Sequence, residues 1–282
     1  MPQISFLKMS GAGNDFVIVD VRKSVEKNNH QFSAAQIAKI SARNNVGCDQ
    51  FILLKNSTIA DALMEIYNSD GSISGACGNA TRCVASILMS EKLMERISVE
   101  TASGVLQAWR ENDLIAVNMG YPKFDWVEIP LTEPKNTDDF VVSEISAHRF
   151  TAVNMGNPHI VTFVDQVLSD DEFFDIGPKL ETNSLFPQKT NVEFAKVLSP
   201  SHIAVRVWER GSGETLACGS GACAVAVAAI KRGLIAREII REKIKISFKG
   251  GDLFVQWSEN GSVIMSGGYQ KIFSGVFDED FL

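Results

Sequence analysis

Alternating apolar and polar positions, together with short runs of β-branched residues, predict β-strands in both halves of the chain. In the first half the predicted strands are Asp15–Asp20, Phe51–Leu54, Ala62–Tyr67, Gly104–Arg110 and Leu114–Met119. In the second half they are Phe150–Met155, His159–Val164, Asn191–Val197, His202–Trp208, Ile244–Phe248 and Asp252–Trp257. The two halves therefore resemble each other in strand content.

Each half also contains one segment typical of a helix that begins at a glycine turn. These segments are Gly78–Leu93 and Gly219–Arg232, and Gly233 after the second is typical of a helix C-cap. The sequences at their starts are near copies, ACGNATRC at residues 76–83 and ACGSGACA at residues 217–224. The duplication predicts an α/β protein of two pseudo-equivalent domains.

The domain boundary is expected in the segment 121–139, which contains three prolines and has no sustained periodicity. This composition is typical of an interdomain connection. We therefore expect an N-terminal domain at residues 1–120 and a C-terminal domain at residues 121–265.

Composition narrows the class of protein. The chain has 282 residues, 45% of them hydrophobic, enough for two buried cores. With 34 acidic and 27 basic residues its net charge is −7, and no Lys/Arg cluster could follow a phosphate backbone, so a nucleic-acid partner is not expected. No secretory signal or membrane span of about 20 apolar residues is evident. A cytoplasmic protein with no membrane partner and five reduced cysteines is expected.

The cysteine at each helix start suggests acid–base chemistry. Cys77 and Cys218 precede helix N-termini, where unpaired N–H groups and the positive end of the helix dipole stabilise an anion. Such positions lower a thiol pKa from about 8.5 to roughly 3.5–7.5, and the same N–H groups can hold a carboxylate. Two matched groups suit inversion of an α-carbon, because one removes a proton from one face while the other delivers a proton to the opposite face. No metal and no other cofactor is required by this scheme.

Other interpretations of the cysteines are open at this point. A zinc site could use Cys77, Cys83, Cys218 and Cys223, but the spacings are C-x5-C and C-x4-C, unlike the C-x2-C of common zinc motifs. Cys83 and Cys223 lie among apolar helix residues and are expected to be buried packing residues. Cys48 is left unassigned.

The chain resembles the diaminopimelate epimerase family over nearly its whole length. The resemblance rests on these segments in this order: KMSGAGNDF at 8–16, GCDQ at 47–50, NSDGS at 68–72, ACGNATRC at 76–83, MGNPH at 155–159, TNVE at 190–193 and ERGSGETLACGSGA at 209–222. Each motif alone is weak, whereas their joint order is specific to the family. The resemblance implies two pseudo-symmetric domains, each a strand-rich sheet or barrel around a central helix, with the C-terminal tail 266–282 returning to the first. A homodimer is a family expectation.

The resemblance also implies an activity, a substrate and a set of site residues. The activity is pyridoxal-phosphate-independent interconversion of LL- and meso-diaminopimelate for lysine and peptidoglycan synthesis. Cys77 and Cys218 match the acid/base pair, with His159 and Glu209 helping to move protons to them. The residues that match substrate-binding positions are Asn14, Gln50, Asn68, Gly78, Asn79, Asn157, Asn191, Glu209, Arg210, Gly219 and Ser220.

Two departures from the family pattern and two alternative functions remain. Ala80 replaces a common glycine and must take an ordinary helical φ, while Ser220 replaces a common threonine and keeps the hydroxyl.

A proline or hydroxyproline racemase would share the paired cysteines, but its substrate has no distal carboxylate for Arg210 to bind. The other alternative is an amino-acid-binding protein without catalysis.

Overall fold

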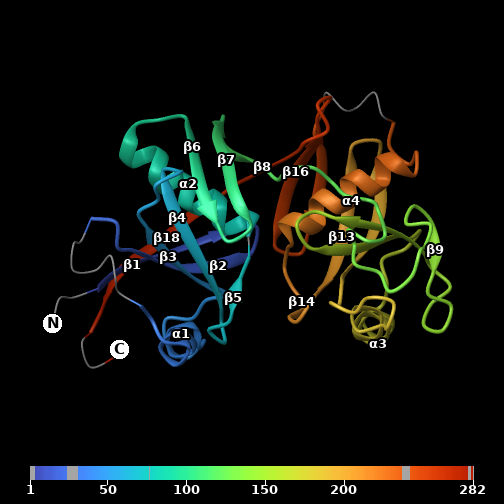
Figure 1. Ribbon diagram of the computed structural model, residues 1–282, viewed down its shortest axis with the longest axis horizontal. Coiled ribbons are helices and arrows are strands. Elements are labelled where there is room, and N and C mark those ends of the chain that lie inside the picture. Colours follow the sequence, from blue (N-terminus) through green and yellow to red (C-terminus); the bar gives the residue numbers. More distant parts are fainter. Residues whose placement is uncertain (1–3, 24–30, 76, 237–241, 279–280, 282) are drawn as a thin grey trace. The chain divides into compact units, whose positions relative to one another are not determined.

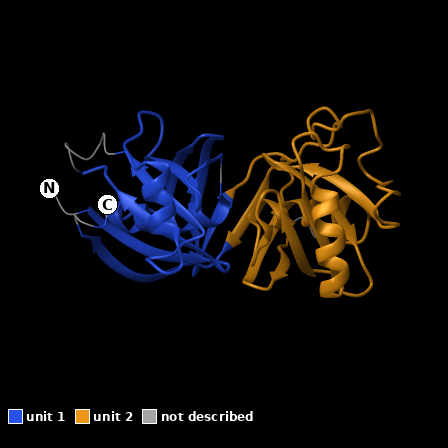
Figure 2. Ribbon diagram, turned by 90° about the horizontal axis from the view of Figure 1, so that it is seen from below, with its two compact units in different colours: residues 1–117, 267–282 blue, residues 118–266 orange. Residues whose placement is uncertain are grey.

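The computed structural model describes residues 4–23, 31–75, 77–236, 242–278 and 281. It divides into two compact units, unit 1 from Met1–Val117 and Gly267–Leu282, and unit 2 from Asn118–Ser266 (Figure 2). The boundary, expected after residue 120, lies between residues 117 and 118. The chain crosses from one unit to the other near the ends of two strands, β8 (Leu114–Asn118) and β17 (Val263–Gly267).

Unit 1 is a strand-rich α/β unit. In chain order its elements are β1 (Ile4–Gly11), β2 (Asn14–Asp20), α1 (Ala34–Ser41), β3 (Gln50–Lys55), β4 (Ala62–Asn68), β5 (Ile73–Ser74), α2 (Gly78–Lys92), β6 (Arg96–Thr101), β7 (Gly104–Glu111), most of β8, and β18 (Gln270–Phe277). The tail expected to return to the first domain is β18, which pairs antiparallel with β1.

Unit 2 repeats this plan. Its elements are β9 (Phe140–Val141), β10 (Arg149–Asn154), β11 (Pro158–Phe163), α3 (Asp170–Glu181), β12 (Asn191–Ser199), β13 (His202–Glu209), β14 (Gly213–Glu214), α4 (Gly219–Lys231), β15 (Ile244–Phe248), β16 (Gly251–Trp257) and most of β17. The strands predicted from sequence are confirmed in both units. The strands β1, β5, β6, β9, β14, β17 and β18 and the helices α1 and α3 were not predicted.

Strand pairing shows that the two units share one topology. In unit 1, β2 is parallel to β3, β3 antiparallel to β4, β4 parallel to β6, and β6 antiparallel to β7. In unit 2 the same relations join β11 to β12, β12 to β13, β13 to β15, and β15 to β16. The helices fall at the same points of the order, α1 with α3 and α2 with α4. The inferred duplication of the domain is confirmed.

One helix of each pair is central and the other is peripheral (Figure 1). Residues 78–86 of α2 are all buried, and so are residues 221–230 of α4. By contrast, α1 packs on β3 and α3 packs on β12 and β13 through one buried face each. The strands thus wrap around α2 and α4, as the family resemblance implied.

The ends of the central helices follow the sequence prediction closely. Helix α2 starts after Cys77, and it stops at Leu93, which takes the left-handed conformation at φ 54°. Helix α4 ends at Lys231 and is followed by Gly233 at φ 67°, the left-handed residue expected at this position. Ala80 has an ordinary helical φ, as predicted.

The interpretation of residues 121–139 as an interdomain connection is wrong. This segment belongs to unit 2, where Ile129 and Leu131 are buried in the hydrophobic core with Phe150 and Phe173. Its backbone is also hydrogen-bonded to unit 2, because Lys123 pairs with Asn154 in an isolated antiparallel β-bridge. The prolines and the lack of periodicity made the segment resemble a linker, although its apolar side chains Ile129 and Leu131 pack in the core.

No helix in the described parts of the chain is both long and apolar enough to cross a membrane.

Candidate active site

Cys77 occupies the N-cap of α2. Its backbone is extended, at φ −147° and ψ 109°, and its Sγ accepts a hydrogen bond from the N–H of Ala80 at 3.4 Å. The Cys77 carbonyl accepts from the N–H of Thr81 at 2.9 Å. Within the described structure, the N–H groups of Gly78 and Asn79 are the first-turn donors without a protein acceptor. They are available to a ligand carboxylate beside the half-buried thiol.

The amide residues of unit 1 lie in two hydrogen-bonded pairs. Asn79 Nδ2 donates to Asn14 Oδ1 at 2.6 Å, and Gln50 Nε2 donates to Asn68 Oδ1 at 3.3 Å. The Asn14–Asn79 bond links the turn after β1 to the start of α2. Gln50 and Asn68 are register partners on β3 and β4. The four amide side chains of unit 1 that were predicted from the sequence are therefore held in place by one another.

A partly buried charge cluster holds this turn. Asp15 accepts from Lys8 and from Arg43, the latter at 2.7 Å, and its N–H donates to Asp49 at 3.0 Å. Burial alone would raise the pKa of the Asp15 carboxyl, but the hydrogen bonds from Arg43 and Lys8 outweigh it and lower the pKa to about 2. The cluster fixes the backbone next to Asn14.

We expect Asp15→Asn to lower the free energy of unfolding at neutral pH by about 2 to 3 kcal/mol, because a depressed carboxyl pKa stabilises the folded state. The sign follows from the folded pKa of about 2 against the ordinary 3.8. The contribution is complete above the unfolded value and is lost as the pH falls from about 4 to about 2. Urea titrations at a series of pH values measure it. A difference between wild type and variant that stays constant down to about pH 2 would contradict this assignment.

Cys218 occupies the equivalent N-cap of α4. Its backbone is again extended, at φ −127° and ψ 118°, and its Sγ accepts from the N–H of Gly221 at 3.4 Å. Ser220 Oγ lies 3.5 Å from the same sulfur. The Cys218 carbonyl accepts a hydrogen bond from the N–H of Ala222. The N–H groups of Gly219 and Ser220 have no protein acceptor in the described structure. The two thiols thus sit in the same local backbone geometry.

The expected lowering of the thiol pKa is wrong for Cys218. Burial raises its pKa well above the ordinary value, and the nearby carboxylates of Glu209 and Glu193 raise it further. The hydrogen bonds from Ser220 and Gly221 act in the opposite direction and are outweighed. Burial beside two carboxylates destabilises the Cys218 thiolate. This effect is larger than the stabilisation that the helix N-terminus provides. The environment of Cys218 therefore favours the thiol, the proton-donating form.

Strand alternation gathers the titratable residues of unit 2 on one face of the sheet. His159 is the register partner of Asn191, and Glu193 follows two residues later on the same face of β12. Val207 pairs with Glu193, so Glu209 falls on that face of β13. This is the face that α4 covers, while the intervening residues of β12 point to the core beneath α3. Cys218 at the start of α4 completes the cluster.

Glu209 is an acid–base partner of Cys218. Its carboxylate interacts with the Cys218 side chain and accepts from Thr215 Oγ1. Burial raises the pKa of the Glu209 carboxyl, and the neighbouring charge of Glu193 also raises it, whereas Thr215, His159 and Cys218 lower it. A carboxyl with a raised pKa can take a proton from a thiol and return it.

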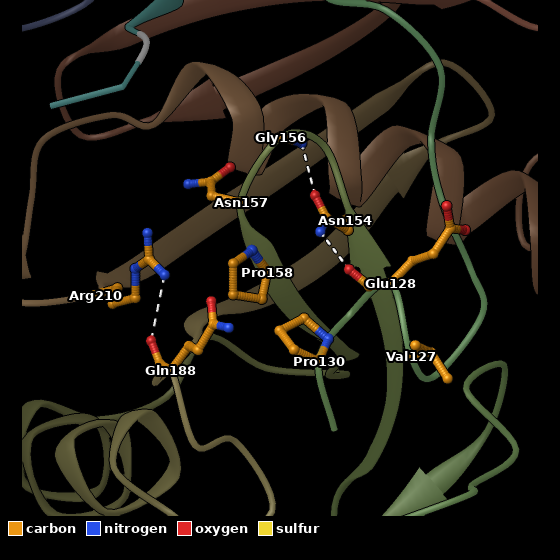
Figure 3. A pocket seen from close by; sticks show the side chains of 9 residues that line it. All are labelled: Val127, Glu128, Pro130, Asn154, Gly156, Asn157, Pro158, Gln188 and Arg210. Carbon is orange, nitrogen blue, oxygen red and sulfur yellow. Dashed lines mark hydrogen bonds between the residues drawn. The ribbon is translucent and has the colours of Figure 1, made fainter. Parts of the chain in front are cut away.

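Arg210 lines a pocket with Asn157 and Pro158 (Figure 3). The cavity volume is about 330 Å³, and Arg210 Nη1 donates to the Gln188 carbonyl at 3.2 Å on its wall. Most of the lining is polar or backbone, which suits a charged ligand group. The exposed guanidinium retains donors for a carboxylate.

Asn191 and Glu181 hold the loop that carries Arg210. Asn191 Oδ1 accepts the N–H of Arg210 at 2.9 Å, and its Nδ2 donates to the Pro158 carbonyl at 2.7 Å. Glu181 accepts from the N–H of Gly211 at 2.9 Å and from Trp208 Nε1 at 2.8 Å. Asn191 is buried and engaged at both ends of its amide, so in this structure it positions the loop.

The remaining three cysteines are buried. Cys83 and Cys223 are fully buried inside α2 and α4, and burial raises the pKa of Cys83 to about 12. Cys48 is buried too, with its Sγ 3.3 Å from Ser41 Oγ. In the described part of the chain, no group of three or more His, Cys, Asp or Glu side chains is placed to hold a metal.

Comparison with known proteins identifies the family of this two-cysteine architecture. The sequence model of the family described as diaminopimelate epimerase matches residues 6–124 and 151–272. The chain belongs to the diaminopimelate epimerase family.

Curated members of the diaminopimelate epimerase family match the full length. The diaminopimelate epimerase of Acidiphilium cryptum is 45% identical over 279 residues, covering 98% of this chain and 97% of its relative. That of Rhodospirillum centenum is 44% identical over 280 residues, covering 98% and 93%.

Solved structures with little sequence identity share the fold. A Bacillus anthracis phenazine biosynthesis protein of the PhzF family has a TM-score of 0.68 at 15% identity, covering 99% of this chain and all of that one. A hydroxyproline epimerase from Agrobacterium vitis, solved with bound trans-4-hydroxy-L-proline, has a TM-score of 0.66 at 13% identity, covering 99% and 93%. At this identity the likeness concerns the fold alone.

Sequence reasoning missed several residues of the epimerase site. Glu193 lies in the motif TNVE, but no function was assigned to it from the sequence. An acidic residue among the apolar residues of β12 could have indicated one. Three other residues contact the site residues or their loops. Asp49 accepts from Asn14 and Glu181 accepts from Gly211, both across segments distant in sequence, while Thr215 donates to Glu209 across a turn. For these three, sequence spacing carries no such signal.

Proposed function

We propose that this protein is a diaminopimelate epimerase that inverts one α-carbon with Cys77 and Cys218 as its two acid–base groups. The observation that carries the proposal is the paired N-cap geometry, in which each cysteine sits at the start of a central helix beside two free N–H groups. One cysteine takes the α-proton as a thiolate while the other donates a proton as a thiol, and the reverse reaction exchanges their roles. The N–H groups at the helix starts stabilise the negative charge that develops on the substrate carboxylate.

The environment of Cys218 assigns it the donor role in one direction. Its raised pKa keeps the proton on sulfur until the carbanion forms. In the reverse direction Cys218 must lose that proton before it can act as a base, and Glu209, which interacts with it, is the proposed acceptor. We assign His159, in the same cluster, a role in moving protons to and from the reacting groups.

We assign the distal end of the substrate to the Arg210 pocket. A guanidinium binds a carboxylate with two parallel hydrogen bonds, and Asn157 on the same wall adds an amide. Gln50, Asn68 and Asn14 are proposed to bind polar groups of the substrate. Proline and hydroxyproline have no second carboxylate, so Arg210 favours diaminopimelate over those substrates.

We also propose a reducing, cytoplasmic location, a homodimer, and independence from metal and pyridoxal phosphate. The two-base scheme needs reduced thiols, which a reducing compartment maintains. The acid–base work is assigned to side chains of the chain itself. Nucleic acid and membranes are not expected partners of an acidic chain with a net charge of −7.

The test is incubation of LL-diaminopimelate with the protein in D2O, followed by NMR. We expect meso-diaminopimelate to form, with deuterium at the inverted carbon, while the remaining LL isomer keeps its protium early in the reaction. This asymmetry follows because the delivered proton comes from a thiol that has exchanged with solvent. Matched incubations with L-proline and trans-4-hydroxy-L-proline should show no exchange. Exchange of those substrates instead, or binding of diaminopimelate without exchange, would refute the proposed function.

A further inference from the structure

His159 and Glu193 form a hydrogen-bonded pair inside unit 2. The distance from His159 Nδ1 to Glu193 Oε1 is 2.6 Å, and neither side chain is exposed to solvent. The second carboxylate oxygen, Oε2, is buried and has no hydrogen-bond partner in the part of the chain that the structure describes. His159 therefore supplies the hydrogen bond to this carboxylate.

The duplicated fold shows that this pair is not needed to build the sheet. The register that joins His159 to Asn191 in unit 2 joins Phe16 to Gln50 in unit 1. Two residues further along the strand, the counterpart of Glu193 is Ile52. Phe16 and Ile52 are fully buried apolar residues. Because burying a carboxylate costs several kcal/mol unless it is paired, a pair that the fold can replace with hydrocarbon indicates a functional role.

The start of α4 is adapted to the carboxylate. A Cβ added at Gly221 would lie 2.8 Å from Glu193 Oε1 and 3.3 Å from Cys218 Sγ. The corresponding residue in unit 1, three positions after the other N-cap cysteine, is Ala80. Glycine at 221 thus makes room for Glu193 beside Cys218, where unit 1 accommodates a methyl group.

The geometry assigns a direction to His159. Its Nδ1 faces Glu193, and its Nε2 lies 2.9 Å from Asn157 Oδ1. A charged ring donates to both oxygens, whereas a neutral ring donates through Nδ1 once the Asn157 amide turns its NH2 toward Nε2. In both states Nδ1 keeps its proton and Nε2 is the nitrogen that exchanges one, on the side of Asn157 and the Arg210 pocket.

We propose that Glu193 is a positioning residue that holds the proton on Nδ1 of His159, so that His159 exchanges protons through Nε2. The inference rests on the proposed function, since it gives His159 its place in the proton path of the epimerase. A carboxylate that fixes the tautomer and orientation of a catalytic imidazole is a known arrangement in other enzymes. Glu193 also adds negative charge next to Cys218 and Glu209, which helps keep Cys218 in the thiol form.

The test is Glu193→Gln, examined by NMR of the histidine ring nitrogens in ¹⁵N-labelled, substrate-free protein between about pH 6 and pH 8. His159 is assigned from the signals lost in His159→Gln. We expect wild type to show a protonated Nδ1 throughout, and Glu193→Gln to show the proton moved to Nε2, because the new amide can turn its NH2 toward Nδ1. With diaminopimelate, kcat should fall about 10- to 100-fold while KM changes less than about twofold.

The matched control is Glu181→Gln, which removes another buried carboxylate of the same unit. Glu181 holds the Arg210 loop, so this variant should raise KM and leave the His159 signals unchanged. If Glu193→Gln does not fold, Glu193→Asp provides the test. It keeps the charge but is one methylene shorter, so kcat should fall about threefold to tenfold with a shifted Nδ1 signal.

Wild-type ring-nitrogen signals in the Glu193 variants, or a rise in KM at constant kcat, would overturn the proposal. The NMR measurement needs no substrate. If wild type fails to turn over diaminopimelate, the proposed function fails, and the tautomer of His159 still decides the role of Glu193.

Discussion

Replacing either Cys77 or Cys218 by Ala should lower epimerase turnover by about 10³- to 10⁴-fold, because each direction of the reaction needs both a thiolate and a thiol. Neither substitution should unfold the protein, since both cysteines lie at helix starts and the strands around α2 and α4 remain. The measurement is meso-diaminopimelate formation from the LL isomer and the reverse. Both directions should fall together in each variant because the equilibrium constant is fixed.

Cys83→Ala and Cys223→Ala are the matched controls. They alter the same two helices five or six residues further along, at fully buried positions assigned to packing. They should cost stability, about 1 kcal/mol each, and leave turnover within about threefold of wild type. Turnover above about a tenth of wild type in Cys77→Ala or Cys218→Ala would exclude the two-base scheme.

The sequence predicted much of the fold because the fold is duplicated and its strands alternate. Matching helix starts at Cys77 and Cys218 were enough to infer two units. The peripheral helix α1 was missed even though Ser33 and Gln36 form a capping box, because the helix is only 8 residues long. The segment 121–139 was misread because Ile129 and Leu131 enter the core without a regular period.

The sequence predicted where the two cysteines lie better than it predicted their pKa values. The N-cap positions of both cysteines followed from the motif, but the raised pKa of Cys218 did not. That shift depends on burial and on the charges of Glu193 and Glu209, which lie on β12 and β13. Asn191 was expected to bind the substrate, and the structure shows that its amide also joins Arg210 to Pro158. Such partners are fixed by strand register, which local sequence does not reveal.

The second large effect is expected from His159→Phe/Glu193→Ile, a double variant that copies Phe16 and Ile52 of unit 1 into unit 2. Turnover should fall about 10²- to 10³-fold, since the variant has no imidazole to move protons and no carboxylate to orient it. The free energy of unfolding should stay within about 2 kcal/mol of wild type, because removal of a buried polar pair offsets the tighter packing of the larger side chains. Urea titration and the diaminopimelate assay measure the two effects.

The single variants supply the decisive comparison. Glu193→Ile leaves His159 Nδ1 without its partner, and His159→Phe leaves a buried carboxylate without its hydrogen bond, so each should destabilise the protein by about 3 kcal/mol. The double variant should therefore be more stable than either single variant, a coupling that independent sites do not show. Additive losses of stability would mean that the two side chains do not compensate each other, and the hydrogen-bonded pair in unit 2 would then lose its functional explanation.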